Sequence, residues 1–129
     1  MRKSFTLIEL IVVLIVVGIL ATIGIPTYRK AVLGAEGRGA VANLKAIQTS
    51  EKVIDLERGV FVACANLVAC NTALNLDMPP DDNYTYGVTI IGGAGGFRAR
   101  ADHVDSNCQY DTTFTQEPEV SAGTCIYEP

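Results

Sequence analysis

The sequence is poor in the residues that catalysis and metal binding require. It contains a single histidine, His103, and its four cysteines form no CxxC pair, so a zinc site is not expected. It shows no nucleophile–base pair, phosphate-binding loop or cluster of metal ligands, and we expect His103 to lie at the surface. We therefore predict that the chain is not an enzyme and uses neither a metal nor a cofactor.

Basic residues are absent from the C-terminal part of the chain. From Ala101 to Pro129 there are six acidic residues and no lysine or arginine. Nucleic acids are bound largely through contacts between basic side chains and phosphate groups. We therefore predict no specific nucleic-acid binding, and we expect this acidic surface to keep the domain soluble.

Charge is also scarce between Phe5 and Ile25, where Glu9 is the only charged residue in an otherwise mostly apolar run that ends before Pro26. A helix of this length spans about 30 Å, the thickness of a bilayer core. No small-residue cleavage site follows the apolar core, so we expect the segment to be retained as a membrane anchor. The pattern predicts a transmembrane helix over residues 5–26.

Two glycines and a proline lie in the second half of this apolar run, at Gly18, Gly24 and Pro26. Proline cannot donate a hydrogen bond to the carbonyl group four residues earlier, and glycine weakens helical turns. We predict that the helix can bend or locally unwind here.

The four cysteines all follow residue 60, and three pairings are possible. The short gaps favour Cys64–Cys70 and Cys108–Cys125, and closing the longer loop would add about 3 kcal/mol of stability on a chain-entropy model. An even number of cysteines beyond a membrane anchor indicates an oxidising compartment. Arg2 and Lys3 favour a cytoplasmic N-terminus, although Arg29 and Lys30 weaken that inference, and the cysteines place the C-terminal domain outside.

Apolar residues spaced by three and four predict an amphipathic helix over residues 27–59, capped by Gly59, with Gln48 on its polar face and Val53 widening its apolar face. Residues 60–83 have no clear period and are expected to form a connecting loop pinned by a disulfide. Strands are expected at Tyr84–Ile91, Phe97–Ala101, Cys108–Thr115 and Thr124–Tyr127, within a region spanning 84–129. The predicted fold is α+β, a long N-terminal helix packed on a small antiparallel sheet of three or four strands.

The run Phe5-Thr6-Leu7-Ile8-Glu9-Leu10 follows a short basic head, residues 1–4, and leads into the apolar helix. It resembles the N-terminus of type IV pilins and of the related pseudopilins of type II secretion systems. The resemblance implies that a prepilin peptidase cuts between Ser4 and Phe5 and methylates the new amino group of Phe5. Glycine usually precedes the cut in this family, whereas this chain has Ser4, which is also small.

The same resemblance implies that Glu9 and Phe5 set the register of assembly, because the family pairs this acid with the freed amine of a neighbouring subunit. The physical argument agrees, since an acid within an apolar segment is costly and Glu9 has no basic partner on its own helix once the head is removed. We also expect that the portion containing Gly18, Gly24 and Pro26 can lose helix when the subunit enters a filament, which would lengthen the subunit.

By resemblance, the chain is expected to be the structural subunit of a type IV pilus used for adhesion, motility or DNA uptake. The expected partners are copies of itself in a helical filament, the prepilin peptidase, the inner membrane, and an inner-membrane assembly platform with its ATPase. The subunit would wait in the inner membrane with its C-terminal domain in the periplasm, and would be extracellular once assembled. Two alternatives stay open, a type II secretion pseudopilin and a single-span anchor for an extracellular binding domain.

Overall fold

The computed structural model describes residues 5–92, 96–123 and 125–127 of the chain. The predicted head at 1–4, with Ser4 of the expected cleavage point, lies outside the described residues, as does Thr124 of the fourth predicted strand. The backbone divides into an N-terminal unit, residues 1–33, and a C-terminal unit, residues 34–129. Each unit is described by itself.

Helix α1, Leu7–Arg58, is continuous and contributes residues to both units. Pro26 lies inside the helix without ending it. On either side of the proline, threonine hydroxyls donate to helix carbonyls, from Thr22 to Ile19 at 2.7 Å and from Thr27 to Ile23 at 3.0 Å. The helix ends as predicted before Gly59, which has a φ of 68° and donates its N–H to the carbonyl of Asp55 at 2.8 Å.

A second helix, α2, spans Leu67–Leu74 and corrects the prediction that residues 60–83 form only a loop. The side chain of Asn66 caps its first turn by accepting the N–H of Ala69 at 2.9 Å. At its end Asn75 adopts a left-handed φ of 53°, a conformation that asparagine tolerates better than most residues. Eight residues make too few turns for an apolar period to be visible in the sequence, so the asparagine caps were the available signal.

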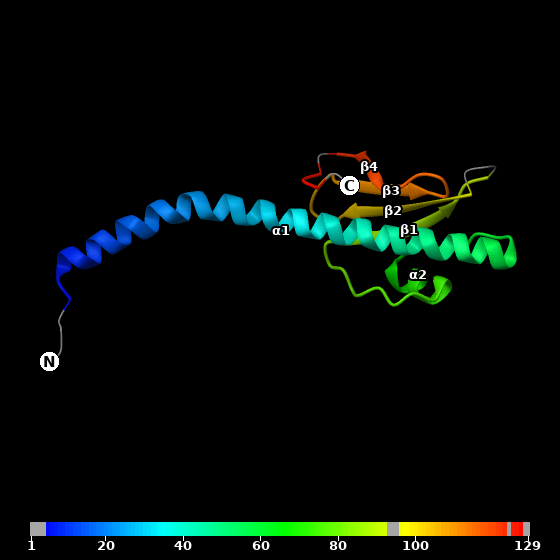
Figure 1. The fold of residues 1–129 in the computed structure, drawn as a ribbon, viewed down its shortest axis with the longest axis horizontal. Helices are drawn as coiled ribbons and strands as arrows, with labels where there is room; N and C mark the ends of the chain where they lie inside the picture. The colour runs from blue at the N-terminus through cyan, green and yellow to red at the C-terminus, as the bar shows by residue number, and fades with distance from the viewer. Residues whose placement is uncertain (1–4, 93–95, 124, 128–129) are drawn as a thin grey trace. The chain divides into compact units, whose positions relative to one another are not determined.

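Four antiparallel strands follow one another in the sheet order β1-β2-β3-β4 (Figure 1). Their bounds are Tyr84–Ile90 for β1, Phe97–His103 for β2, Gln109–Thr113 for β3 and Glu119–Ala122 for β4. The predicted α+β fold and the first three strands are confirmed. The fourth strand was predicted too late in the chain, because β4 ends before Gly123, whose φ of 77° turns the backbone away from the sheet.

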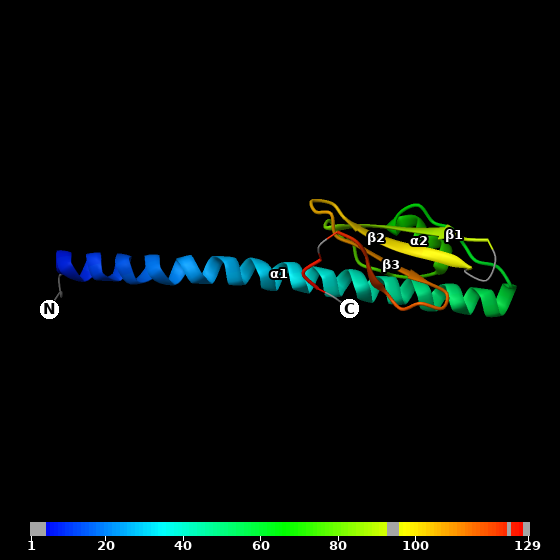
Figure 2. The ribbon, with the colours of Figure 1, turned by 90° about the horizontal axis from the view of Figure 1, so that it is seen from above.

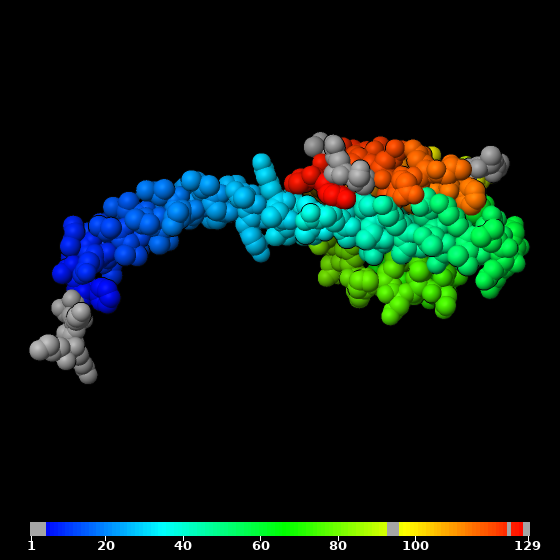
Figure 3. Space-filling view, viewed as in Figure 1, coloured from blue at the N-terminus to red at the C-terminus, as the bar shows by residue number. Residues whose placement is uncertain are grey.

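The core of the C-terminal unit lies between α1 and one face of the sheet. Figure 2 shows the strands lying over the part of α1 that follows Gly34, and Figure 3 shows α2 and the C-terminal strands on opposite flanks of that part. Alternate residues of the strands point inward, as expected for a sheet with one solvated face. The inward side chains pack against Leu44 and Ile47 of α1; the largest of them are Tyr84, Tyr86, Val88, Phe97 and Tyr110.

The buried face of α1 differs from the predicted face at two residues, Gln48 and Val53. Gln48, expected on the polar face, is buried and donates to the carbonyls of Thr113 at 2.7 Å and Gln116 at 2.8 Å. Val53, expected to widen the apolar stripe, is 46% exposed, whereas Glu51, which falls on the predicted stripe, is fully buried. Tertiary contacts with the β3–β4 connection and with the loop after α1 fix these positions, and helical periodicity alone does not contain that information.

A side chain of β3 and the C-terminal segment both approach α1 closely at Gly37. A Cβ atom at this position would lie 2.8 Å from the Tyr110 hydroxyl and 2.9 Å from Cβ of Tyr127. The Tyr110 hydroxyl is itself held in place by donating to the carbonyl of Tyr127 at 2.6 Å. The absence of a side chain at Gly37 therefore lets the C-terminal segment lie against the helix.

We predict that Gly37→Ala destabilises the C-terminal unit, because overpacking of this kind costs about 1–3 kcal/mol and outweighs the better helix propensity of alanine. Gly39→Ala is the matched control, since no atom lies within 4 Å of a Cβ placed there. The control should gain up to about 1 kcal/mol. Thermal unfolding of the full chain in detergent measures both, and equal changes for the two variants would contradict the contact.

The buried Glu51 carboxyl makes one hydrogen bond, accepting the N–H of Val62 through Oε2 at 3.0 Å. Its other oxygen, Oε1, is buried and has no partner within the described part of the chain. Burial raises the pKa of the Glu51 carboxyl, and the Val62 hydrogen bond offsets only part of this rise. The folded state therefore holds the proton more tightly than the unfolded chain does.

We predict that wild-type stability falls, relative to Glu51→Gln, as the pH rises from the unfolded pKa of Glu through the higher folded pKa. The sign follows because the folded state binds more protons in that window, so raising the pH favours the unfolded state. Glutamine keeps an oxygen for the Val62 N–H and does not titrate. Unfolding midpoints across this window test the idea, with the exposed Glu57→Gln as control; parallel curves for wild type and Glu51→Gln would refute it.

Candidate functional site

The start of α1 is organised around Thr6, which precedes the first helical residue. The Thr6 hydroxyl oxygen accepts the N–H of Glu9 at 3.3 Å. In return, Oε2 of Glu9 accepts the Thr6 N–H at 2.9 Å and the Thr6 hydroxyl at 2.8 Å. This reciprocal arrangement is a capping box, which satisfies donors that a helix N-terminus otherwise leaves unpaired.

Glu9 therefore has hydrogen-bond partners in its own chain, which the sequence analysis missed. The signal was present as a threonine followed three residues later by a glutamate. Within the described residues, all of the hydrogen bonds to the Glu9 carboxylate reach Oε2 and none reaches Oε1. A carboxylate offers about four acceptor sites. Glu9 can thus cap its helix and still accept a donor from another molecule.

The apolar side chains that follow Glu9 are exposed around the whole circumference of the helix in the N-terminal unit. The exposed fractions are 61% for Leu10, 65% for Leu20 and 68% for Ile23, and Phe5 before the helix is 86% exposed. The helix is long and apolar enough to cross a membrane, and none of its most hydrophobic part is buried in the structure. This surface needs lipid or protein to cover it.

The three residues predicted to weaken the helix are spaced along this exposed surface. Gly18 and Gly24 are helical, and a Cβ atom at either position would meet no other atom within 4 Å. Pro26 is helical as well. Neither glycine is therefore required here by close packing within the chain. That the segment bends or unwinds stays a prediction.

Both predicted disulfides are present, Cys64–Cys70 and Cys108–Cys125. The first joins α2 to the segment before it, where Cys64 also pairs with the outer edge of β1 through two backbone hydrogen bonds with Val88. The second ties the start of β3 to the segment after β4. Arg38 of α1 lies over the ring of Tyr127, 5.9 Å from its centroid, so the C-terminal segment is held to the helix from a second side.

The remaining predicted positions do not converge on a catalytic site. Among the described residues, no group of three or more His, Cys, Asp and Glu side chains could hold a metal ion. The prediction that His103 lies at the surface is wrong, because its side chain is only 9% exposed and packs edge-on against Tyr84. Tyr84 covers it because the end of β2 and the start of β1 are paired in the sheet, a contact that composition does not reveal.

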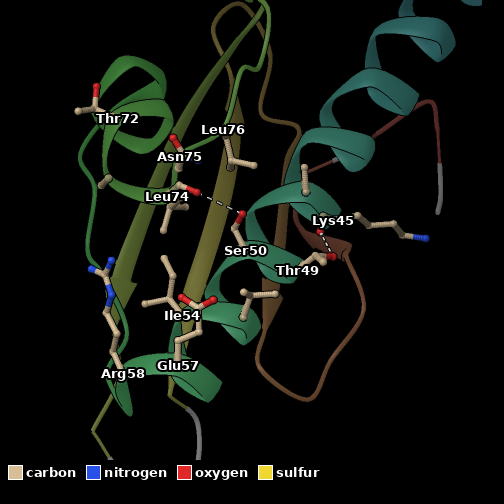
Figure 4. A pocket seen from close by; sticks show the side chains of 13 residues that line it. Lys45, Thr49, Ser50, Ile54, Glu57, Arg58, Thr72, Leu74, Asn75 and Leu76 are labelled. Atoms are coloured by element: carbon tan, nitrogen blue, oxygen red, sulfur yellow. Dashed lines mark hydrogen bonds between the residues drawn. The ribbon is translucent and has the colours of Figure 1, made fainter.

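A groove runs between the last turns of α1 and the end of α2 (Figure 4). The Ser50 hydroxyl points across it and lies 3.4 Å from the carbonyl of Leu74, while the Thr49 hydroxyl donates to the backbone carbonyl of Lys45 in the same helix at 2.8 Å. Both hydroxyls therefore already form hydrogen bonds with backbone carbonyl groups of residues that line the groove. The groove thus shows how α2 is held beside α1, and its described contacts suggest no chemical reaction.

Comparison with known proteins gives one family match, at the N-terminus. The family described as "Prokaryotic N-terminal methylation motif" matches residues 1–25. This match includes Phe5, Glu9 and both glycines of the apolar run. No solved structure matches the chain.

The curated relatives extend the similarity into the C-terminal unit. The chain is 32% identical over 99 residues to the "Type IV major pilin protein PilA" of Myxococcus xanthus (strain DK1622), a match covering 77% of this chain and 41% of that protein. It is 32% identical over 97 residues to two proteins of Pseudomonas aeruginosa named "Fimbrial protein", with 73% of this chain and 55% of each relative covered. The chain thus spans about half the length of the curated relatives it matches.

Proposed function

We propose, from the match of residues 1–25 to the prokaryotic N-terminal methylation motif and the similarity to type IV pilin and fimbrial proteins, that the chain is a type IV pilin, a structural subunit that polymerises into a surface pilus. The observation that carries the proposal is the apolar helix from Leu7 to Ile25, whose side chains are exposed around it and which holds one acid near its start. Such a helix suits a subunit that passes from lipid into a filament core.

Two environments can cover this helix in turn. In the inner membrane, lipid surrounds the helix and anchors the subunit until it is assembled. In a filament, the helices of neighbouring copies take the place of lipid. The hydrophobic gain of this exchange is small because lipid tails are about as apolar as leucine, so close packing and polar pairing decide whether assembly is favourable.

We assign the polar pairing to Glu9. Cleavage between Ser4 and Phe5 would create an amine at Phe5, next to the Thr6 N–H that Glu9 already accepts. The carboxylate retains free acceptor capacity at Oε1, so the amine of a neighbouring copy can bind it without breaking the capping box. Pairing two opposite charges in apolar surroundings neutralises both and fixes the axial step between copies.

The proposed partners follow from this cycle. They are a prepilin peptidase that cuts and methylates at Phe5, an inner-membrane assembly platform with its ATPase, and further copies of the chain. The C-terminal unit would face the periplasm before assembly, where the two disulfides can form, and the cell exterior afterwards. Adhesion, motility or DNA uptake would be the role of the assembled fibre.

Shearing intact cells distinguishes a pilin from a pseudopilin. If the proposal holds, the sheared fraction contains fibres that yield this chain on denaturing gels. A chain found only in the membrane and periplasmic fractions of piliated cells would contradict the pilus role. The printed names of the relatives, a major pilin and fimbrial proteins, favour the first outcome.

We predict that Glu9→Ala and Glu9→Gln both insert into the membrane at wild-type levels and both fail to assemble. Alanine removes the charge and the cap, whereas glutamine preserves the capping box and removes the charge alone. The amount of the chain in the sheared fraction should fall at least about tenfold for each, which corresponds to about 1.4 kcal/mol.

Comparing the two variants separates two roles of the acid. If Glu9→Gln assembles as wild type does while Glu9→Ala does not, helix capping is sufficient and the charge pairing is refuted. The amount of each variant in the membrane fraction, measured on the same cells, controls for insertion and turnover.

A further inference from the structure

His103 is a buried imidazole that the proposed assembly cycle does not use. It is the last residue of β2, and its side chain is 9% exposed. The ring of Tyr84 packs edge-on against it, with centroids 4.9 Å apart. Its Nε2 atom is buried and has no hydrogen-bond partner among the described residues, and the nearest charged atom is Oε2 of Glu36 on α1, at 3.9 Å.

The other ring nitrogen determines where the proton of the neutral imidazole lies. Nδ1 of His103 accepts the backbone N–H of Asp105 at 3.0 Å. A nitrogen that accepts a hydrogen bond carries no proton, so the neutral ring must carry its proton on Nε2, facing Glu36. The same tautomer excludes Nε2 as a metal ligand, because its lone pair is not available.

The groups around the ring come from each element packed against it. Glu36 faces it from α1, Tyr84 from β1, and Asp105 from the loop that follows His103. Burial raises the pKa of the Tyr84 hydroxyl, which therefore stays neutral under ordinary conditions. Tyr110 of β3 lies beyond Tyr84, at 6.1 Å between ring centroids, and Asp102 beside the histidine accepts a hydrogen bond from Gln109. A second proton on the ring would thus meet the Glu36 carboxylate as its counter-charge.

We propose that His103 is a pH-sensitive latch on the β2–β3 loop, residues 104–108, closed by the hydrogen bond from Asp105 to Nδ1 and opened when a proton occupies Nδ1. Nε2 is already protonated, so the second proton can bind only at Nδ1. The protonated nitrogen cannot accept the Asp105 N–H, and that hydrogen bond is lost. The attraction between the charged ring and Glu36 offsets part of the loss.

Opening of the latch reaches the segment after β4 through a direct backbone contact. A Cβ atom at Gly123 would lie 1.6 Å from the carbonyl oxygen of Asn107, so the β2–β3 loop abuts the chain at Gly123. The ends of the loop stay fixed by other bonds, from the Val104 N–H to the Asn83 carbonyl at 2.9 Å and from the His103 N–H to the Cys108 carbonyl at 3.0 Å. The movement is therefore confined to residues 105–107 and their contact with Gly123.

Hydrogen exchange of the full chain in detergent, read residue by residue by NMR at about pH 5 and about pH 8, tests the latch. After correction for the intrinsic exchange rate, the protection of the Asp105 amide should be at least about tenfold lower at the acidic pH. The Val104 amide, whose partner is a backbone carbonyl, is the internal control and should keep its protection. Equal protection of Asp105 at both pH values would overturn the proposal.

Two variants distinguish the latch from general loosening. His103→Asn places a side-chain oxygen near the position of Nδ1 that cannot take up a proton, so the Asp105 amide should stay protected at both pH values. Glu36→Gln removes the nearby carboxylate and leaves both ring nitrogens of His103 in place, so the Asp105 amide should still lose protection on acidification. If Asp105 loses protection on acidification in His103→Asn as it does in wild type, the histidine is not the group that titrates. Unchanged far-ultraviolet circular dichroism confirms that each variant is folded.

Discussion

Glu9 carries the only charged side chain between Phe5 and Ile25, and this single constraint organises the start of the N-terminal unit. The capping box with Thr6 satisfies one oxygen within the chain. It also turns the acid to the start of the helix, where unpaired backbone N–H groups and the helix dipole stabilise negative charge. The other oxygen retains acceptor capacity, so the capped carboxylate can still accept a donor from another molecule.

The C-terminal unit meets a different constraint, because about one hundred residues supply only a thin core. One disulfide joins α2 to the segment before it, the other joins the segments that flank β3 and β4, and the glycine at position 37 lets the C-terminal segment reach α1. Several polar groups inside the unit form hydrogen bonds between different elements. One example runs from Asn43 on α1 to the Tyr86 hydroxyl at 3.0 Å, and from that hydroxyl to Asp81 at 2.5 Å. Such contacts tie the helix, the sheet and the preceding loop into one unit.

Sequence reasoning succeeded where the signal is local. The apolar run, the cap at Gly59, the first three strands and both disulfides each follow from a short pattern or a short gap. It failed where the answer depends on what lies across the core. Gln48 is buried because carbonyls of the β3–β4 connection accept its amide, and His103 is buried because β1 covers the end of β2. The capping box is an intermediate case. Its Thr6–Glu9 spacing is visible in the sequence, but the family resemblance predicted only a role for the charge of Glu9 and not its hydrogen bonds with Thr6.

In the proposed assembly cycle, an exposed apolar helix exchanges lipid for copies of itself and a carboxylate sets the spacing. Its central claim is an intermolecular contact between the Phe5 amine and Glu9. Solid-state NMR of fibres grown from a mixture of two subunit populations, one with ¹⁵N-labelled phenylalanine and the other with ¹³C-labelled glutamate, measures that contact directly. The account predicts magnetisation transfer between the Phe5 amine nitrogen and the Glu9 carboxylate carbon, which can arise only between different copies. Well-ordered fibres that show no such transfer would contradict it.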